Sequence, residues 1–309
     1  MIAPVLLLLG ACGGDNGVAD NGLQVVATTS ILGDIASAVV GDEGTVQVLI
    51  PLGVDSHEFQ PSAQEASLLA GADLVVANGL GLERGVADLL SSTEADGVPV
   101  IELAPLVDPL PFPGDHSEHE DEDSEEHEDE EEHGDEDPHF WMDPIRVGDA
   151  AAALAGELSL MDPEGEWQQR AGAYADAMSA TDASIREMLD EVPAEHRKMV
   201  TNHEAFGYFA DRFGFEIVGV VIPGGSTLAE PSSAELAALV EVMRDEGVRV
   251  IFAETTQPAD LAEAVAAELG GDVQVVELYT ESLGPDGSTA ATLSGMLLTN
   301  AERISAALG

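Results

Sequence analysis

The feature that most constrains this chain is a repeated alternation of short β-branched apolar runs with longer alanine-rich stretches. Strand-like runs occupy residues 24–27, 46–50, 73–77, 98–103, 199–201, 216–221, 248–253 and 273–278. Helix-like stretches lie between these runs, and alternating strands and helices predict parallel sheets covered by helices. A chain of 309 residues is long enough for two such domains. We therefore expect an α/β protein with two lobes of βα units.

A long helical stretch separates the two sets of strands. From Pro163 to about Leu189 the sequence contains no strand signal and few helix breakers. At 1.5 Å per residue such a helix would be about 40 Å long, enough to link two lobes. Two consecutive surface helices are the alternative interpretation. The expected division is a leader and tether over 1–22, an N-terminal lobe over 23–160, a linking helix over 161–192 and a C-terminal lobe over 193–309.

The N-terminus has the pattern of a secretory leader. The apolar run from Ile2 to Leu9 is too short to span a bilayer but fits the hydrophobic region of a signal peptide. The run Leu9-Gly10-Ala11-Cys12 resembles a bacterial lipobox, in which the cysteine is lipidated, and this predicts a membrane-anchored protein outside the cytoplasm. Because Cys12 is the only cysteine, no disulfide can form within the chain. A frayed apolar terminus is the alternative, since Met1 to Pro4 contain no basic residue.

The charge of the chain is strongly negative, with 60 acidic and 10 basic side chains and a formal net charge of −50. Such a field repels phosphate backbones and concentrates cations, so we expect no nucleic-acid partner. Residues 115–137 hold 16 of the acidic side chains and four histidines, with almost nothing apolar, and are expected to be disordered. The four histidines, expected to collect metal weakly, are His116, His119, His127 and His133. A solubilising linker is the alternative interpretation.

Three histidines outside the acidic run occupy similar places in the βα pattern. His57 follows the run ending at Ile50, His203 follows the run ending at Thr201, and His139 precedes a helix. Glu281 follows the last strand-like run. Because ligands bind at the carboxyl ends of strands in open α/β sheets, these side chains should meet in the cleft between the lobes. Three imidazole nitrogens and one carboxylate oxygen suit four-coordinate zinc.

Four motifs surround these residues, in this order along the chain: Asp55-Ser56-His57-Glu58-Phe59-Gln60-Pro61-Ser62, Pro138-His139-Phe140-Trp141-Met142-Asp143-Pro144, Thr201-Asn202-His203-Glu204-Ala205-Phe206-Gly207-Tyr208-Phe209 and Leu278-Tyr279-Thr280-Glu281-Ser282-Leu283-Gly284. With them the chain resembles the metal-binding proteins of zinc and manganese ABC importers, the zinc-uptake solute-binding family. The resemblance runs from about Leu23 to the C-terminus. It implies two α/β lobes joined by a long rigid helix, with the metal buried between the lobes.

The resemblance also implies the ligand set His57, His139, His203 and Glu281. The family usually has Asp at the last of these positions, whereas this chain has the longer Glu. Relatives that prefer manganese commonly carry a carboxylate at the position of His203, so the imidazole here favours zinc. Beside the ligands, Glu254 is expected to orient a histidine, and Trp141 and Phe206 to wall the site. His196, Glu58 and Glu204 are expected to be exposed, and the alternative for Glu58 and Glu204, which adjoin ligand histidines, is that they support or replace a ligand.

These observations predict a non-enzymatic, extracytoplasmic, monomeric zinc-binding protein that delivers its ion to an ABC-type membrane permease. A manganese- or iron-binding importer component is the alternative. A secreted zinc hydrolase with Glu204 as general base is a further alternative, although catalytic zinc needs an open coordination position and the fourth ligand here is expected from the protein. An adhesion protein is disfavoured because no extra module or aromatic patch is present.

Overall fold

The computed structural model describes residues 22–112, 136–270 and 273–309, which form two parallel four-stranded sheets. The first sheet has the order β2-β1-β3-β4, and its strands are β1 (Leu23–Ala27), β2 (Gly44–Val48), β3 (Leu74–Ala77) and β4 (Val100–Glu102). The second has the order β6-β5-β7-β8, and its strands are β5 (Lys198–Thr201), β6 (Glu216–Val220), β7 (Val250–Glu254) and β8 (Gln274–Leu278). The relative order is the same in both sheets. The predicted α/β fold with two lobes is confirmed.

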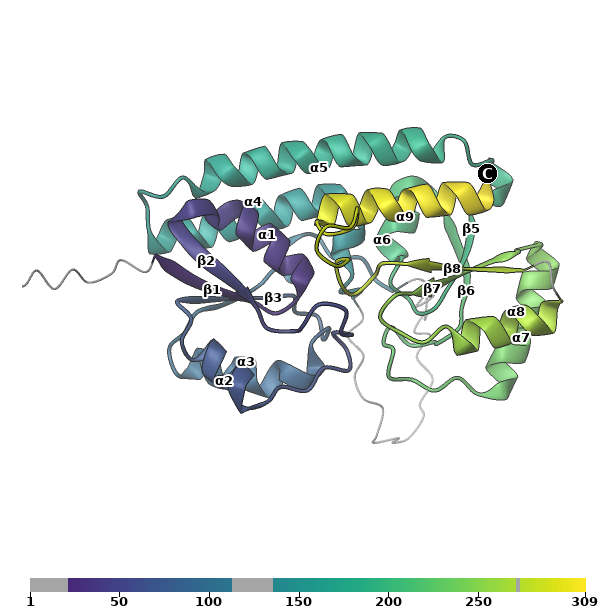
Figure 1. The fold of residues 1–309 in the computed structure, drawn as a ribbon, viewed down its shortest axis with the longest axis horizontal. Helices are drawn as coiled ribbons and strands as arrows, with labels where there is room; N and C mark the ends of the chain where they lie inside the picture. Colours follow the sequence, from purple (N-terminus) through teal and green to yellow (C-terminus); the bar gives the residue numbers. More distant parts are fainter. Residues whose placement is uncertain (1–21, 113–135, 271–272) are drawn as a thin grey trace, which may run out of the picture.

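Helices cover both faces of each sheet (Figure 1). On the outer faces lie α2 (Ala63–Leu69), α3 (Ala87–Ala95), α7 (Ser233–Glu246) and α8 (Asp260–Leu269). On the shared face lie α1 (Ser30–Val40), α4 (Pro144–Met161), α5 (Trp167–Leu189), α6 (Gly207–Phe213) and α9 (Leu293–Leu308). Short 3₁₀ turns occur at Gly41–Glu43, Arg84–Val86, Ala104–Leu106, Phe140–Met142 and Ala194–His196. Each lobe is therefore a three-layer βα unit.

Several helix starts follow from capping residues visible in the sequence. Ser62 caps α2 and Glu65 bonds back to it, and Ser232 caps α7 with Glu235 in the same way. Asp143 caps α4 by accepting a 2.8 Å hydrogen bond from the backbone N–H of Ile145. These side chains satisfy backbone donors that the first helical turn leaves unpaired, so the helices begin there.

The long helix α5 begins at Trp167, later than the expected start at Pro163, because α4 continues to Met161. A turn separates the two helices, and the indole N–H of Trp167 closes it with a 2.7 Å bond to the carbonyl of Asp162. The 23 residues of α5 span about 34 Å at 1.5 Å per residue. Figure 1 shows α5 extending over both lobes, packed along α4 and α9.

One hydrophobic core runs beneath α5 and joins the two lobes. It contains Ile35 of the first lobe, Leu154 and Ile185 of the long helices, and Phe252 and Ile304 of the second lobe. Two smaller clusters fill the outer layers, one under α2 and α3 and the other under α7 and α8. A large apolar interface limits relative movement of domains, so the shared core holds the two sheets in a fixed relation. Among the described helices none is long and apolar enough to cross a membrane.

Candidate metal site

Four side chains that the sequence placed at strand ends and a helix start meet between the lobes: His57, His139, His203 and Glu281. His57 follows β2, His139 precedes the Phe140–Met142 turn, His203 follows β5 and Glu281 follows β8. One potential ligand atom from each lies within 4.8 Å of all the others, and every one of the four side chains is buried. The site is thus built at the carboxyl ends of strands from both sheets.

Four of the six separations between these atoms are close to the edges of a small tetrahedron, and all six lie within 4.8 Å. The Nε2 atom of His139 lies 3.4 Å from Nε2 of His57, 3.3 Å from Nε2 of His203 and 3.4 Å from Oε1 of Glu281. A fourth edge, from His203 Nε2 to Glu281 Oε1, measures 3.7 Å. Four ligands about 2.0–2.1 Å from a central ion lie about 3.3–3.4 Å apart in a tetrahedron. The cluster therefore has the size of a transition-metal site.

Glu281 provides a second test of whether a cation fits. Its Oε2 atom accepts a hydrogen bond from the hydroxyl of Ser56, whereas its buried Oε1 has no hydrogen-bond partner. A buried carboxylate oxygen without a partner is costly unless a cation or another donor satisfies it. Because Oε1 faces the imidazole nitrogens, the residues present fit a bound metal ion.

Asp137 holds His139 in the orientation that metal binding requires. Its Oδ1 atom lies 2.6 Å from His139 Nδ1 and accepts a 2.9 Å bond from the backbone N–H of His139. Donation from Nδ1 leaves the lone pair of Nε2 free for a metal. Sequence reasoning assigned Asp137 to the disordered acidic run, yet it is fully buried and ordered. The repeated Asp-x-His spacing, also seen at Asp55 and His57, was the signal that could have identified it.

Asp55 repeats the backbone part of this arrangement. Its Oδ1 atom accepts a 2.8 Å bond from the backbone N–H of His57, which fixes a local turn of the kind that aspartates favour. Its Oδ2 atom accepts a 2.7 Å bond from the side-chain amide of Gln257 in the second lobe. Burial and the nearby carboxylate of Glu281 raise the pKa of Asp55 to about 6. Asp55 therefore links the His57 loop to the opposite lobe.

A chain of hydrogen bonds orients His203, as expected for Glu254. The Oε1 atom of Glu254 is bonded to Nδ1 of His203, and its Oε2 accepts a 2.7 Å bond from the Thr280 hydroxyl. The carbonyl of Thr280 accepts a 2.9 Å bond from the indole N–H of Trp141. Trp141 also lies edge-on to His139, with ring centroids 5.3 Å apart. Its ring therefore walls the site and joins residues of both lobes.

The electrostatics of the cluster favour positive charge. Burial lowers the pKa of His57 to about 3, so its imidazole is neutral at physiological pH. Burial also acts against a charged His139, but the carboxylates of Asp137 and Glu281 outweigh it and raise that pKa to about 10. Burial similarly opposes ionisation of Glu281, whereas the three imidazoles hold its pKa well below the usual range. A bound cation would replace the protons that otherwise balance these carboxylates.

The other singled-out residues lie around or outside this cluster. Glu58 and His196 are exposed, as expected, whereas Glu204 is half-buried and burial raises its pKa. Phe206 is buried, with its ring 6.0 Å from that of Phe209. Cys12 and the four acidic-run histidines lie outside the described residues.

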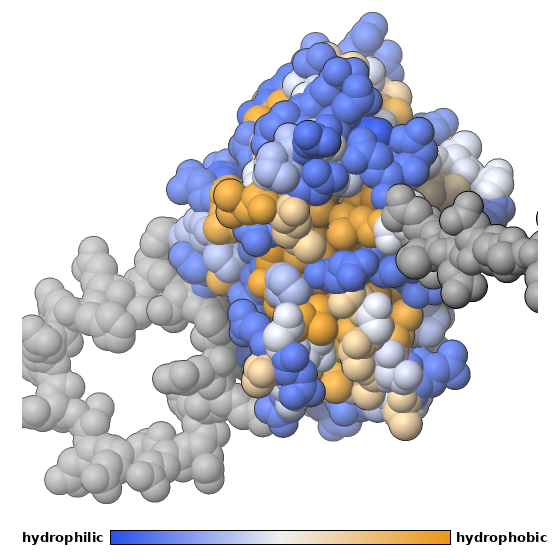
Figure 2. Space-filling view, turned by 90° about the vertical axis from the view of Figure 1, so that its left-hand side faces the viewer, coloured by the Kyte–Doolittle hydropathy of each residue, from blue (hydrophilic) through white to orange (hydrophobic). Residues whose placement is uncertain are grey.

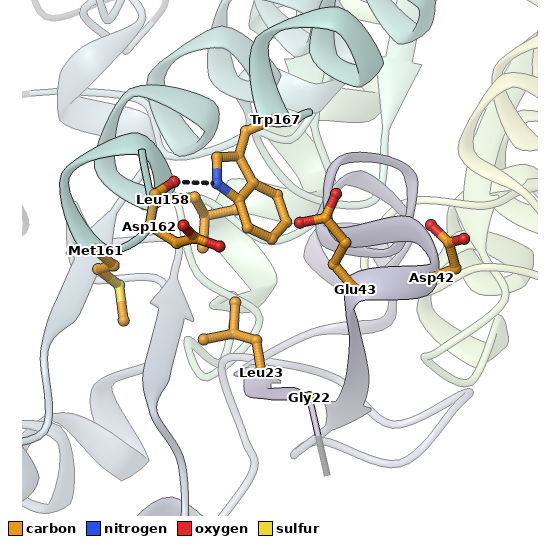
Figure 3. A pocket seen from close by; sticks show the side chains of 8 residues that line it. All are labelled: Gly22, Leu23, Asp42, Glu43, Leu158, Met161, Asp162 and Trp167. Atoms are coloured by element: carbon orange, nitrogen blue, oxygen red, sulfur yellow. Dashed lines mark hydrogen bonds between the residues drawn. The ribbon is translucent and has the colours of Figure 1, made fainter. Parts of the chain in front are cut away.

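The cluster itself is closed to solvent, and a much larger hollow lies elsewhere. A hollow of about 10 Å³ reaches His57, which is barely enough for one water. A hollow of about 510 Å³ lies where β1 begins, at the opposite strand ends from the ligands, and is lined by Leu23, Leu158 and Trp167 with acidic neighbours (Figure 3). Figure 2 shows this end of the molecule, where apolar side chains form a band between polar ones. The candidate site is therefore a packed cluster and not an open pocket.

Comparison with known proteins agrees with the fold and identifies the family. The family described as zinc-uptake complex component A, periplasmic, matches residues 25–307. The chain belongs to this family. The zinc-binding protein TroA of Treponema pallidum is 29% identical over 96% of this chain and 92% of its own length. A solved structure of TroA has a TM-score of 0.81 at 27% identity, covering 93% of this chain and 99% of TroA.

Other relatives in the zinc-uptake family carry the names of other metals. The manganese-binding lipoprotein MntA of Halalkalibacterium halodurans is 27% identical over 98% of this chain and 95% of its own length. The iron-binding protein YfeA of Yersinia pestis is 27% identical over 93% of this chain and 86% of its own length. Family membership therefore identifies a metal-binding, substrate-binding protein of an ABC transporter, but it does not fix the ion.

Proposed function

We propose that this protein captures zinc outside the cytoplasm and delivers it to a membrane permease of the ABC type. The proposed ligands are His57, His139, His203 and Glu281. The observation that carries the proposal is the convergence of three imidazole nitrogens and one carboxylate oxygen, all within 4.8 Å of one another, with four of their six separations at 3.3–3.7 Å. Four-coordinate sites with nitrogen-rich donors are typical of zinc, whereas manganese prefers more oxygen ligands.

Manganese or iron is the alternative cargo, which the names of relatives support. Zinc exceeds manganese and iron in affinity for most nitrogen-containing sites, so simple competition in vitro would favour zinc at almost any such site. The decisive experiment is elemental analysis of the protein purified from its own cells without added metal, followed by titration of each ion alone. We expect about one equivalent of zinc per chain. Stoichiometric manganese or iron would overturn the choice of ion.

The ligand assignment is tested by substitution. Replacing any one histidine with Ala should weaken zinc binding by orders of magnitude, because the remaining donors no longer complete the coordination shell. Glu281→Gln should cost less, since a water can enter the vacant position. His196→Ala is the matched control, because this exposed histidine lies outside the cluster. A variant without His57, His139 and His203 that binds zinc like the parent would exclude this ligand set.

A hydrolytic function is the competing class, with Glu204 as the general base. The non-enzymatic role is supported by the fourth donor, Glu281, which takes the position that a catalytic zinc keeps open for water. A hydrolase screen of the zinc-loaded protein, with Glu204→Gln as comparison, separates the two classes. Activity that depends on both zinc and Glu204 would establish the enzyme.

Three further parts of the proposal concern the N-terminus, the acidic run and the oligomeric state. Cys12 is proposed to carry a lipid anchor, and Cys12→Ala should move the protein from the membrane fraction to the soluble fraction. His116, His119, His127 and His133 are proposed to collect metal near the cleft. A monomer is expected in solution, which size-exclusion chromatography with light scattering measures directly.

A further inference from the structure

Ser56 and Glu281 form a buried pair in which the two oxygens of the Glu281 carboxylate have different surroundings. The Ser56 hydroxyl donates to Oε2 of Glu281, and both side chains are buried. The other oxygen, Oε1, has no hydrogen-bond partner and lies 3.4 Å from Nε2 of His139 and 3.7 Å from Nε2 of His203. Only Oε1 is therefore free to bind an ion among the three imidazoles.

The backbone that carries Glu281 is held in place by the first lobe. The backbone N–H of Gly53 donates a 2.8 Å bond to the hydroxyl of Ser282, and the backbone N–H of Leu283 donates a 3.0 Å bond to the hydroxyl of Ser30. These bonds fix the two residues that follow Glu281. They position the backbone only, whereas the Ser56 hydroxyl contacts Oε2 itself, so the carboxylate does not present both oxygens while Ser56 retains one of them.

We propose that Ser56 determines the metal preference of the site by keeping Glu281 monodentate, an inference that rests on the proposed function. Carboxylates bind metals through one oxygen or through both. One oxygen with three imidazoles gives the four-coordinate geometry of zinc. Two oxygens would give a five-coordinate site with a larger share of oxygen, which favours manganese. The Ser56 hydroxyl thus disfavours the second geometry by occupying Oε2.

The test is Ser56→Ala, which removes the hydroxyl and frees Oε2. We expect the ratio of the manganese to the zinc dissociation constant to fall by about threefold to tenfold, the effect of one hydrogen bond. Both constants are measured by competition with a fluorescent chelator of known affinity. The second readout is the absorption of the cobalt-loaded protein, since four-coordinate cobalt absorbs visible light more strongly than five-coordinate cobalt. The parent should give the strong four-coordinate spectrum and the variant a weaker one.

Ser30→Ala is the matched control, because it loosens the same loop at Leu283 without freeing a carboxylate oxygen. Its ratio of dissociation constants and its cobalt spectrum should equal those of the parent. Thermal unfolding of all three proteins checks that they fold. If Ser56→Ala does not fold, X-ray absorption of the zinc-loaded parent still tests the inference, because the edge shape and the mean ligand distance distinguish four-coordinate from five-coordinate zinc.

The outcomes separate this inference from the proposed function. Two results would overturn the role of Ser56 and leave the proposed function intact, provided that zinc still binds tightly. One is an unchanged ratio of the manganese to the zinc dissociation constant in Ser56→Ala. The other is an equal fall of that ratio in Ser30→Ala. A bidentate Glu281 in the parent would do the same. Absence of any tight divalent-metal site in the parent would overturn both. A lower ratio and a weaker cobalt spectrum in Ser56→Ala alone would establish Ser56 as the residue that sets metal preference.

Discussion

Tyr208 and Asp137 connect the base of the acidic run to the second lobe. The hydroxyl of Tyr208, on α6, donates a 2.7 Å hydrogen bond to the carbonyl of Asp137 and accepts a 3.0 Å bond from the backbone N–H of Leu110. The backbone N–H of Asp137 also donates a 2.7 Å bond to the carbonyl of Leu110. Because Asp137 binds His139 directly, Tyr208 positions a proposed ligand through one intermediate residue.

Tyr208→Phe is predicted to destabilise the fold and to speed metal release. The change leaves a half-buried donor, the N–H of Leu110, and a buried acceptor, the carbonyl of Asp137, unpaired, which costs about 1–3 kcal/mol. Thermal unfolding measures the stability, and mixing the zinc-loaded protein with excess chelator measures the release rate. Tyr174→Phe is the control, since its hydroxyl bonds Asp34 away from the cluster at 2.7 Å. Equal acceleration of release in both variants would contradict a positioning role for Tyr208.

Asp137→Asn and Glu254→Gln are each predicted to weaken zinc binding about tenfold to a hundredfold. Each removes a negative charge that bonds the Nδ1 atom of a proposed ligand, so Nε2 of that ring becomes less basic and less firmly oriented. The measurement is the zinc dissociation constant by chelator competition at neutral pH. Asp34→Asn, at a half-buried carboxyl away from the cluster, should leave that constant unchanged. Parent-like binding in both variants would show that these carboxylates do not support the ligands.

Replacing residues 113–135 with a short Gly-Ser turn is predicted to leave the tight site intact. Pro111 and Glu136 already pair as an antiparallel bridge, and bridge partners lie about 4.5–5.5 Å apart, so a short turn can rejoin them. Calorimetric titration should show fewer weak zinc equivalents and the same tightest dissociation constant. Loss of the tight site would show that histidines of the acidic run are primary ligands. Unchanged stoichiometry would leave the run as a solubilising linker.

Asp182→Asn is predicted to remove part of the dependence of stability on pH in acid. Burial acts against ionisation of Asp182, but bonds from Arg212 at 2.8 Å and Arg186 at 3.0 Å outweigh it and lower its pKa below 3.8. Because the pKa is lowered by folding, the unfolded chain binds the proton more readily than the folded one. The ionised Asp182 therefore stabilises the fold above pH 3.8, and this stabilisation is lost as the pH falls through the lower pKa of the folded protein. The melting temperatures of parent and variant should therefore differ by a few degrees at pH 7 and converge in acid. A constant difference across this range would contradict the assignment.

Much of the fold followed from local patterns in the sequence. The strand-like runs became β1 to β8, and the apolar residues of the central strands β1, β3, β5 and β7 are largely buried between helical layers. Ser62, Asp143 and Ser232 marked helix starts because a capping side chain acts on the next few residues only. The same βα pattern placed His57, His203 and Glu281 at strand ends, where such sheets bring side chains together.

Contacts between distant residues decided what the sequence alone left open. Asp137 looked like part of an acidic run because its burial depends on Tyr208, 71 residues away. The pairing of Ser56 with Glu281 joins residues 225 positions apart, and nothing local distinguishes Ser56 from an exposed serine. The sequence by itself determined the elements, their order and the candidate donors, since these depend on periodicity and short-range capping. The tertiary structure decided which donor atoms face one another and which are held by a second residue, because hydrogen-bond geometry exists only once the two lobes are packed on their shared core.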